Sequence, residues 1–238
     1  MISQKGKIDI VIPARNKQNI RPELLQVIKN EPRAGRLIIT EEKPLSVARK
    51  NACLRAETEW VAMFDDDMII PPEWFDLVVE HVGGNVGAIS TVADSIDRDF
   101  RAYQTVVNQV FPLESMDTVP HINNILIRRK LMESYNPPRL FLSEDWFMKR
   151  HVEKAGYVWK TIGRIGVINT GSEKSAVGVG IAYNRFGHYS VYQLTRRFVA
   201  RLFLSPFAMV LTRRLKTLRN LWHKDVEFFA GWLKETFR

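Results

Sequence analysis

The chain has 238 residues, 45% of them hydrophobic, which is enough for one substantial core or for one domain with an appendage. Its composition is that of an ordinary globular protein, with no sign of a low-complexity or fibrous sequence. A single cysteine, Cys53, excludes an internal disulfide and a cysteine cluster. We expect Cys53 to be a small core residue in a reducing, cytoplasmic compartment.

The net charge of +9 is concentrated near the C-terminus. Residues 189–238 contain 10 Lys or Arg and 3 Asp or Glu, whereas the rest of the chain is nearly neutral. Such a cationic segment suits nucleic acid or an anionic membrane, or it serves solubility alone. We therefore expect one domain at residues 1–188 and a basic helical tail at residues 189–238.

Short apolar runs indicate strands, and helical patterns lie between and after them. The strand-like runs, rich in Val, Ile and aromatic residues, are residues 7–13, 36–40, 60–64 and 86–92. The helical patterns cover residues 20–30, 48–57, 71–82 and 143–157. We expect Ser46 and Ser143 to be N-caps and Gly156 to end the last helix. This alternation favours an α/β domain with a mostly parallel sheet.

Polar residues directly follow three of the predicted strands. They are residues 13–16, Glu41–Glu42 and Asp65–Asp67. Because α/β sheets bind ligands beyond the carboxyl ends of their strands, we expect the three clusters to share one rim. Adjacent carboxylates suit a divalent cation, Mn²⁺ or Mg²⁺, that also binds a diphosphate. The alternative is a solvated turn whose acids cap the next helix.

Three segments, in order, resemble the signatures of family 2 glycosyltransferases. They are IDIVIPARN (residues 8–16), LSVARKNACLRAETEWVAMFDDDMIIPPEWF (45–75) and FLSEDWFMKRHVEKAGY (141–157). The resemblance extends over residues 7–170. It implies a Rossmann-like nucleotide-sugar-binding α/β domain with a central mixed sheet. The helical spacing of apolar residues in the tail independently predicts C-terminal amphipathic helices. It also implies an inverting, metal-dependent glycosyltransferase.

The resemblance implies which residues bind the donor. The nucleotide pocket would be lined by Pro13, Ala14, Arg15 and Asn16, with Glu41 or Glu42 at the base or ribose. Asp65 would lie towards the nucleotide and share the metal with Asp67, and Asp66 would belong to the same donor site. Arg49 would face phosphate.

The resemblance implies that Asp145 is the general base and that Glu144 helps to place the acceptor. A cation stabilises the charge that develops on the departing nucleoside diphosphate. A carboxylate on the other side of the anomeric carbon then deprotonates the acceptor hydroxyl for in-line attack, which inverts that centre. Asp145 has a second explanation as an acid in the first turn of a helix, without a catalytic part.

The chain departs from the family pattern at several positions. Lys50 replaces a common asparagine, and Asn169 stands where many members have a metal-binding histidine. The metal then has one protein ligand fewer, or His188 moves in from the glycine-rich segment at residues 174–187; the alternative is an ordinary surface histidine. The short segment after residue 40 leaves the base-contacting glutamate undecided.

The stretch DDDMIIPPEW also resembles the dolichyl-phosphate mannose synthase branch, except that Ile69 replaces a glutamine. A phosphate acceptor needs no base, yet the chain retains Glu144–Asp145. We therefore expect a hydroxyl acceptor, such as a lipid-linked glycan, with a polyprenyl phosphate as the alternative. GDP-mannose is the expected donor, ahead of UDP-sugars, which makes the enzyme a hexosyltransferase of the mannosyl type.

The basic tail has three interpretations: a core helix, a dimer helix, or a helix that lies on a membrane surface, which we prefer. A helix is predicted to start at Ser205–Pro206, and the longest uncharged run there, residues 202–212, is shorter than the ~20 residues that span a bilayer. The aromatic residues of the tail, Trp222, Phe228, Phe229 and Trp232, suit an anionic interface. We expect peripheral association with the inner face of the cell membrane, and no nucleic-acid binding, because no module for it accompanies the charge.

Two other classes of function remain. A nucleotidyltransferase would need a glycine-rich basic loop near the N-terminus, and PARNKQN (residues 13–19) has no glycine. A non-enzymatic protein could bind membrane or nucleic acid through the tail and retain an inactive transferase domain.

Overall fold

The computed structural model describes residues 6–96, 120–137, 144–171, 195, 199, 226–234 and 236. The chain divides into two compact units, one made of residues 1–94 and 116–171 and the other of residues 95–115 and 172–238. The predicted boundary after residue 188 falls outside the described residues and stays a prediction.

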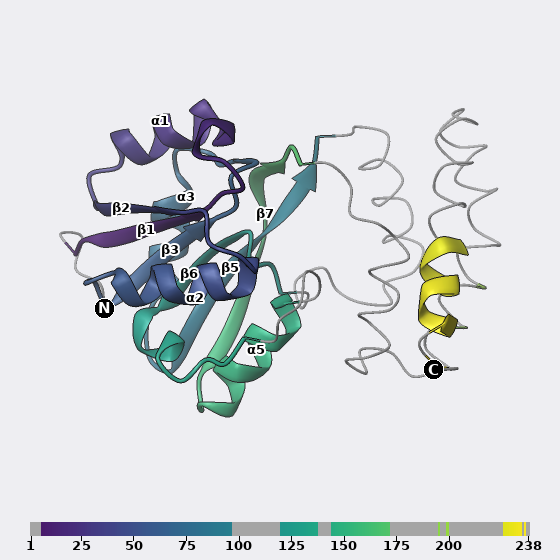
Figure 1. Cartoon of the computed structure of the whole chain (residues 1–238). Coiled ribbons are helices and arrows are strands. Elements are labelled where there is room, and N and C mark those ends of the chain that lie inside the picture. The colour runs from purple at the N-terminus through teal and green to yellow at the C-terminus, as the bar shows by residue number, and fades with distance from the viewer. Residues whose placement is uncertain are drawn as a thin grey trace. The chain divides into compact units, whose positions relative to one another are not determined.

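A seven-stranded mixed sheet forms the centre of the first unit (Figure 1). In spatial order the strands are β2 (Ala34–Thr40), β1 (Ile8–Pro13), β3 (Trp60–Phe64), β6 (Asn124–Arg128), β5 (Val86–Ser95), β7 (Val158–Asn169) and β4 (Met68–Ile69). The predicted α/β fold with a central mixed sheet is confirmed. The expectation of a mostly parallel sheet is wrong: β1 pairs in parallel with β2 and β3, but β3–β6, β5–β6 and β4–β7 are antiparallel.

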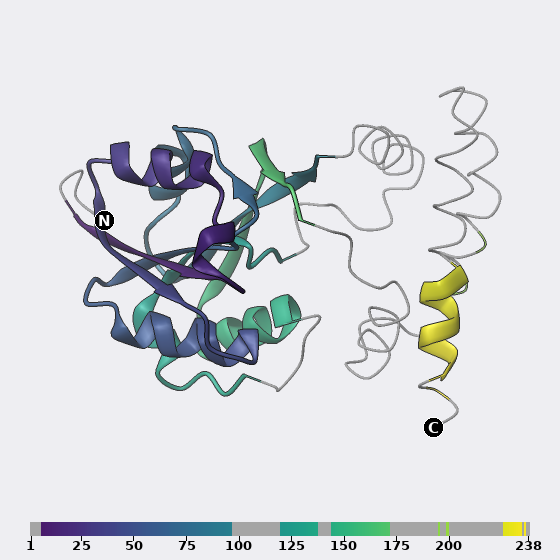
Figure 2. The same cartoon turned by 45° about the horizontal axis from the view of Figure 1, so that its top comes forward.

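Helices cover both faces of the sheet (Figures 1 and 2). Helices α1 (Pro22–Asn30) and α3 (Trp74–Val79) pack on one face, and α2 (Leu45–Arg55) and α5 (Glu144–Lys154) pack on the other. Short 3-10 turns, η1 (Lys17–Asn19) and η3 (Arg129–Met132), follow β1 and β6. This arrangement leaves the ends of the strands as the place where a ligand can approach the sheet.

Two apolar cores lie on opposite faces of the central strands. In β1, Ile8, Ile10 and Ile12 pack towards α1 and α3, whereas Val11 packs towards α2. All four side chains are fully buried, which confirms the prediction of strands buried on both faces. Burial of one such side chain stabilises the fold by about 1.5–3 kcal/mol. The site therefore rests on a well-packed sheet.

The start of α2 differs from the sequence prediction. Ser46 was expected to be the N-cap, but the helix begins at Leu45 and Ser46 is buried in its first turn. The reason is Pro44, whose extended conformation turns its carbonyl towards the N–H groups of Val47 and Ala48, each at 3.0 Å. The predicted stop after α5 is confirmed, because Gly156 has the left-handed φ of 80°.

The described part of the second unit includes a helix at residues 226–234. Trp232 is buried there, and Phe228 and Phe229 are partly buried. The other residues named in the tail prediction, together with Ser143, the segment at 174–187 and His188, lie outside the described residues. No helix among the residues that the structure describes has the length and apolarity to span a membrane. Association of the tail with a membrane surface stays a prediction.

Candidate active site

The three polar clusters that follow β1, β2 and β3 lie together at one rim of the sheet. Pro13 pairs with Thr40, so β1 and β2 end at the same level. The backbone N–H of Arg15 donates to Asp66 Oδ2 at 3.2 Å, which joins the first cluster to the third. The backbone N–H of Lys17 donates to Glu41 Oε1 at 2.9 Å, which joins it to the second. The predicted rim is therefore present.

The acidic run Asp65–Asp67 is held by three separate segments. The N–H of its first residue donates to the carbonyl of Asn123 at 3.0 Å. The carbonyl of its second residue accepts from the N–H of Arg21 at 3.0 Å. The carbonyl of its third residue accepts from both the N–H and the hydroxyl of Thr170, at 2.9 and 2.8 Å. The run is therefore a fixed part of the sheet rim, anchored on the start of β6, the start of α1 and the end of β7.

Arg49 of α2 joins the acidic run to the first residue of α5. Its Nη2 donates to Asp65 Oδ1 and its Nη1 donates to Glu144 Oε2, both at 2.5 Å. Arg49 is only 4% exposed, so it does not present its guanidinium to solvent as a residue facing phosphate would. Burial alone would lower the pKa of Arg49, but the charges of Asp65 and Glu144 outweigh burial and raise it. Arg49 therefore stays charged and holds two carboxylates.

The two acids that begin α5 have different surroundings. Glu144 is 4% exposed and points at Arg49, whereas Asp145 is half-buried. Burial raises the pKa of Glu144; Arg49 opposes this, and the nearby charge of Asp145 adds to it. The pKa of Glu144 is therefore raised mainly by burial, while its ion pair with Arg49 favours the charged carboxylate. The geometry places the Glu144 side chain against Arg49, and its predicted part in placing the acceptor stays a prediction.

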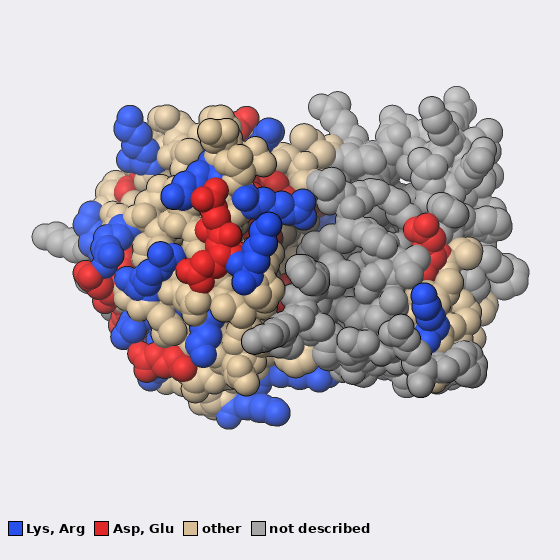
Figure 3. Space-filling model, viewed as in Figure 1, with Lys and Arg blue, Asp and Glu red and all other residues tan. Residues whose placement is uncertain are grey.

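The remaining predicted donor residues surround the start of η1 and α2. Asn16 caps η1 by accepting the N–H of Gln18 at 2.9 Å, and Glu42 accepts from Asn51 Nδ2 at 2.7 Å. Ala14 is buried, and Arg15 is exposed. Burial raises the pKa of Asp66, and the hydrogen bond from the N–H of Arg15 opposes it. Acidic side chains lie among Lys and Arg on the face of the first unit shown in Figure 3.

The predicted metal ligands, Asp65 and Asp67, both lie at this rim. Within the described residues, no group of three or more His, Cys, Asp or Glu side chains is arranged to hold a metal ion. A Cβ added at Gly171 would lie 1.8 Å from Asp67 Oδ2, so the carboxylate occupies the space that a side chain at 171 would fill. The Asn169 side-chain oxygen accepts the N–H of Gly171 at 2.7 Å, which fixes the loop beside Asp67.

The sequence matches the model of glycosyl transferase family 2 over residues 10–151, which is more than half of the chain. The chain belongs to this family. Among curated proteins none matches the chain. The predicted family is thereby confirmed, while the narrower likeness to dolichyl-phosphate mannose synthases stays a prediction.

Two solved structures resemble this family 2 transferase. A mannosyltransferase from Pyrobaculum calidifontis, solved with GDP-Man and Mn²⁺, has a TM-score of 0.63 at 14% identity, covering 98% of this chain and 87% of that one. A glucosyl-3-phosphoglycerate synthase from Mycobacterium tuberculosis, solved with Mn²⁺, UDP and glucosyl-3-phosphoglycerate, has a TM-score of 0.50 at 12% identity, covering 71% and 73%. At these identities the likeness establishes a shared fold.

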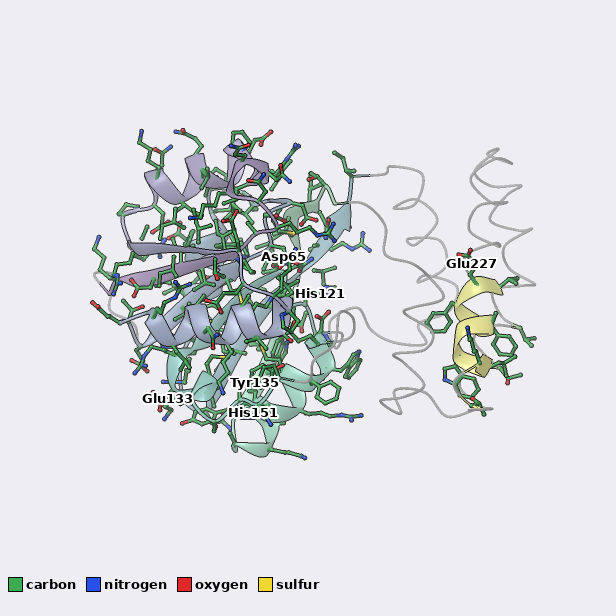
Figure 4. The ribbon with its side chains drawn as sticks, in the orientation of Figure 1. Asp65, His121, Glu133, Tyr135, His151 and Glu227 are labelled. Atoms are coloured by element: carbon green, nitrogen blue, oxygen red, sulfur yellow. The ribbon has the colours of Figure 1, made fainter. Side chains whose placement is uncertain are left out.

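The transferase has a further histidine at the rim that the sequence did not suggest. His121 lies just before β6 and is partly buried (Figure 4). Its Nε2 atom is buried and makes no hydrogen bond to any described residue. Burial lowers the pKa of His121, and the charge of Asp145 acts in the opposite sense. A lone histidine in an irregular segment carries no periodicity or motif, so sequence reasoning had no signal for it.

Beneath the rim, the transferase buries two groups that do not face the site. Burial raises the pKa of Cys53 to about 12, so its thiol is inert, and its predicted place in the core is confirmed. Burial also raises the pKa of Tyr135, which is 2% exposed, and the charge of Glu144 adds to the effect. Both residues belong to the apolar core on the face of the sheet that α2 and α5 cover.

Proposed function

We propose that the protein transfers a sugar from a nucleoside diphosphate donor to an acceptor hydroxyl, with the help of a divalent cation and with inversion. The observation that carries this proposal is the buried link Asp65–Arg49–Glu144. It joins the acidic run at the end of β3 to the helix that begins with Glu144–Asp145. Membership of the family and the shared fold support the reaction class. The link connects the acidic run that would bind the cation and the diphosphate to the helix start that would supply the base.

Asp65 and Asp67 are the residues that would hold the cation. Their oxygens are the hard ligands that Mg²⁺ and Mn²⁺ take, and such ions complete their shell with phosphate oxygens and water, so two protein carboxylates suffice. The bound cation would neutralise charge on the departing diphosphate. The solved relatives were determined with Mn²⁺, which supports the choice of a divalent ion. Arg49 would hold the Asp65 carboxylate in place through the hydrogen bond from Nη2 to Oδ1.

Asp145 is the base in this proposal. The bond between the anomeric carbon and the diphosphate oxygen breaks as the acceptor oxygen attacks from the opposite side. The hydroxyl proton goes to Asp145, and the electron pair leaves with the diphosphate. Glu144 acts through Arg49, because its buried side chain contacts that guanidinium.

For the substrates, we propose GDP-mannose and a hydroxyl of a lipid-linked glycan, with transfer at the inner face of the cell membrane. The mannosyltransferase of the same fold was solved with GDP-Man, which supports the donor. The retained Glu144–Asp145 pair supports a hydroxyl acceptor, because a phosphate acceptor would need no base. A polyprenyl phosphate remains the alternative acceptor.

A donor panel tests the proposed function. GDP-mannose, UDP-glucose and UDP-N-acetylglucosamine are each added to the protein with Mn²⁺ or with EDTA, and unfolding temperature and nucleotide release are measured. We expect GDP-mannose to stabilise the protein only with Mn²⁺, by about 2.7 kcal/mol at 100 times its dissociation constant. If no donor stabilises the protein, the proposal is wrong. If a donor stabilises the protein equally in EDTA, the cation has no part in donor binding.

Replacement of Gly171 by alanine tests the position of Asp67. The new Cβ would lie 1.8 Å from Asp67 Oδ2, so the carboxylate must move. We expect the Mn²⁺ affinity, measured as the metal dependence of donor stabilisation, to fall about 10–100-fold. Gly83→Ala is the matched control, because no atom lies within 4 Å of its added Cβ. Unchanged Mn²⁺ affinity in Gly171→Ala would show that Asp67 does not bind the ion from this position.

A further inference from the structure

His121 lies at the same rim as the acidic run. In the β3–β6 ladder Phe64 pairs with Asn124, and the N–H of Asp65 donates to the carbonyl of Asn123. The chain before β6 therefore runs beside the end of β3, and His121 is two residues further out. The flanking residues Pro120 and Ile122 are buried, so the backbone on both sides of the imidazole is anchored. Figure 4 shows His121 and Asp65 at the same edge of the unit.

The imidazole has a polar atom without a hydrogen bond in a place where that costs stability. Its Nε2 is buried, and no described residue donates to it or accepts from it. A buried polar atom without a hydrogen bond destabilises a fold, and native proteins contain few of them. His151, by comparison, has its Nε2 at 2.7 Å from the carbonyl of Leu131. Other buried side-chain atoms of the described residues also make no hydrogen bond, among them Trp74 Nε1 and the Tyr135 hydroxyl. His121 differs from these two core residues in lying at the rim beside the end of β3, where a ligand can supply the partner.

The charge state of His121 limits what that ligand is. Burial lowers its pKa, which favours the neutral ring, and Asp145 is the charged group whose field acts on it. A neutral imidazole has one donor and one acceptor nitrogen, which matches a hydroxyl group. A phosphate would need a cationic partner and would be repelled by Asp145. The surroundings of His121 therefore favour a neutral, hydroxyl-bearing ligand.

We propose that His121 binds the acceptor, with its Nε2 hydrogen-bonded to a hydroxyl group beside Asp145. This inference rests on the proposed function and adds an acceptor-contacting residue to it. His121 orients the acceptor oxygen, and the hydroxyl proton goes to Asp145, so the imidazole carries no net proton through the reaction. The acceptor class is then a polyol or glycan hydroxyl, in preference to a lipid phosphate.

The test uses His121→Leu and His121→Gln in the full chain, with His81→Leu as the matched control. His81 is also partly buried, but it lies after α3 beside Lys160, away from the acidic run. The probes are GDP-mannose with Mn²⁺, with water or methyl α-mannoside as the acceptor. Unfolding temperature, donor affinity and GDP release are measured for each protein.

We expect His121→Leu to unfold at the same or a higher temperature than the wild type and to bind the donor within twofold. GDP release is expected to fall about 100-fold, because the acceptor oxygen is no longer positioned. His121→Gln, which keeps a hydrogen-bonding group, is expected to lose less, and His81→Leu to retain full activity.

Two results would overturn the inference. If His121→Leu releases GDP at the wild-type rate, the imidazole does not contact the acceptor. If it unfolds at a clearly lower temperature than His81→Leu and loses donor binding, the imidazole is structural. A wild-type protein that binds no nucleotide sugar would instead overturn the proposed function, and this inference with it.

Discussion

Asp145→Asn is expected to abolish sugar transfer while leaving donor binding intact. Asparagine has nearly the same shape as aspartate but cannot take the proton of the acceptor hydroxyl. A positioned base contributes about 10²–10⁴-fold to such a step, so transfer should fall by that factor. Asp67→Ala should lose transfer and donor affinity together, because Asp67 belongs to the cation side. Donor affinity by calorimetry and transfer by nucleotide release separate the two variants.

Glu153→Gln is the control for Asp145→Asn, since Glu153 lies on the exposed side of the same helix. The competing explanation of Asp145 is an acid that favours the start of α5 through the helix dipole. In that case the substitution would change stability by about 0.3–1 kcal/mol and leave transfer unchanged. Intact transfer by Asp145→Asn would therefore remove Asp145 from the role of base.

Arg49→Met is expected to have the largest effect on stability. It leaves the carboxylates of Asp65 and Glu144 without their shared guanidinium, at a position where Arg49 and Glu144 are each only 4% exposed. Loss of one partner from a buried ion pair costs about 3–5 kcal/mol. The free energy of unfolding, measured in urea, should fall by that amount. The exposed pair Arg36–Glu57 provides the control, and Arg36→Met should cost no more than about 1 kcal/mol.

The stability deficit of Arg49→Met should shrink as the pH falls. The pKa of Glu144 in the folded protein lies above its ordinary value, and without Arg49 it should rise further. A carboxyl whose pKa is raised on folding destabilises the fold as the pH rises from the ordinary value, about 4.3, through the raised one. Protonation below that window removes the unpaired charge. A deficit that equals that of Arg36→Met, or that grows in acid, would show that the buried link is not what holds this region.

Much of the rim could be predicted from sequence because its signals are local. The apolar runs of β1 and β3 define buried strands, and polar residues at strand ends are enough to place Glu41–Glu42 and Asp65–Asp67 on one edge. The order of the second half of the sheet could not be predicted in the same way. β6 returns antiparallel beside β3, and no local pattern specifies that pairing.

The contacts of individual side chains were harder to predict than their place in the chain. Arg49 was located in the right helix, but its partners are 16 and 95 residues away in sequence, so their distances depend on the whole fold. The buried position of Ser46 follows from Pro44, which caps the helix two residues before the expected cap. His121 had no motif at all, and only the pairing of β6 with β3 brings it to the rim.

The three backbone anchors of Asp65–Asp67 also determine when in folding the site can form. They reach Arg21, Asn123 and Thr170, the last across 103 residues of chain. Closing long loops costs entropy, so contacts of this separation form after the local ones. The acidic run therefore acquires its final geometry only once α1, β6 and β7 have joined the sheet. A partly folded chain has the three aspartates but not their arrangement. The proposed donor site is therefore complete only when the whole domain has folded.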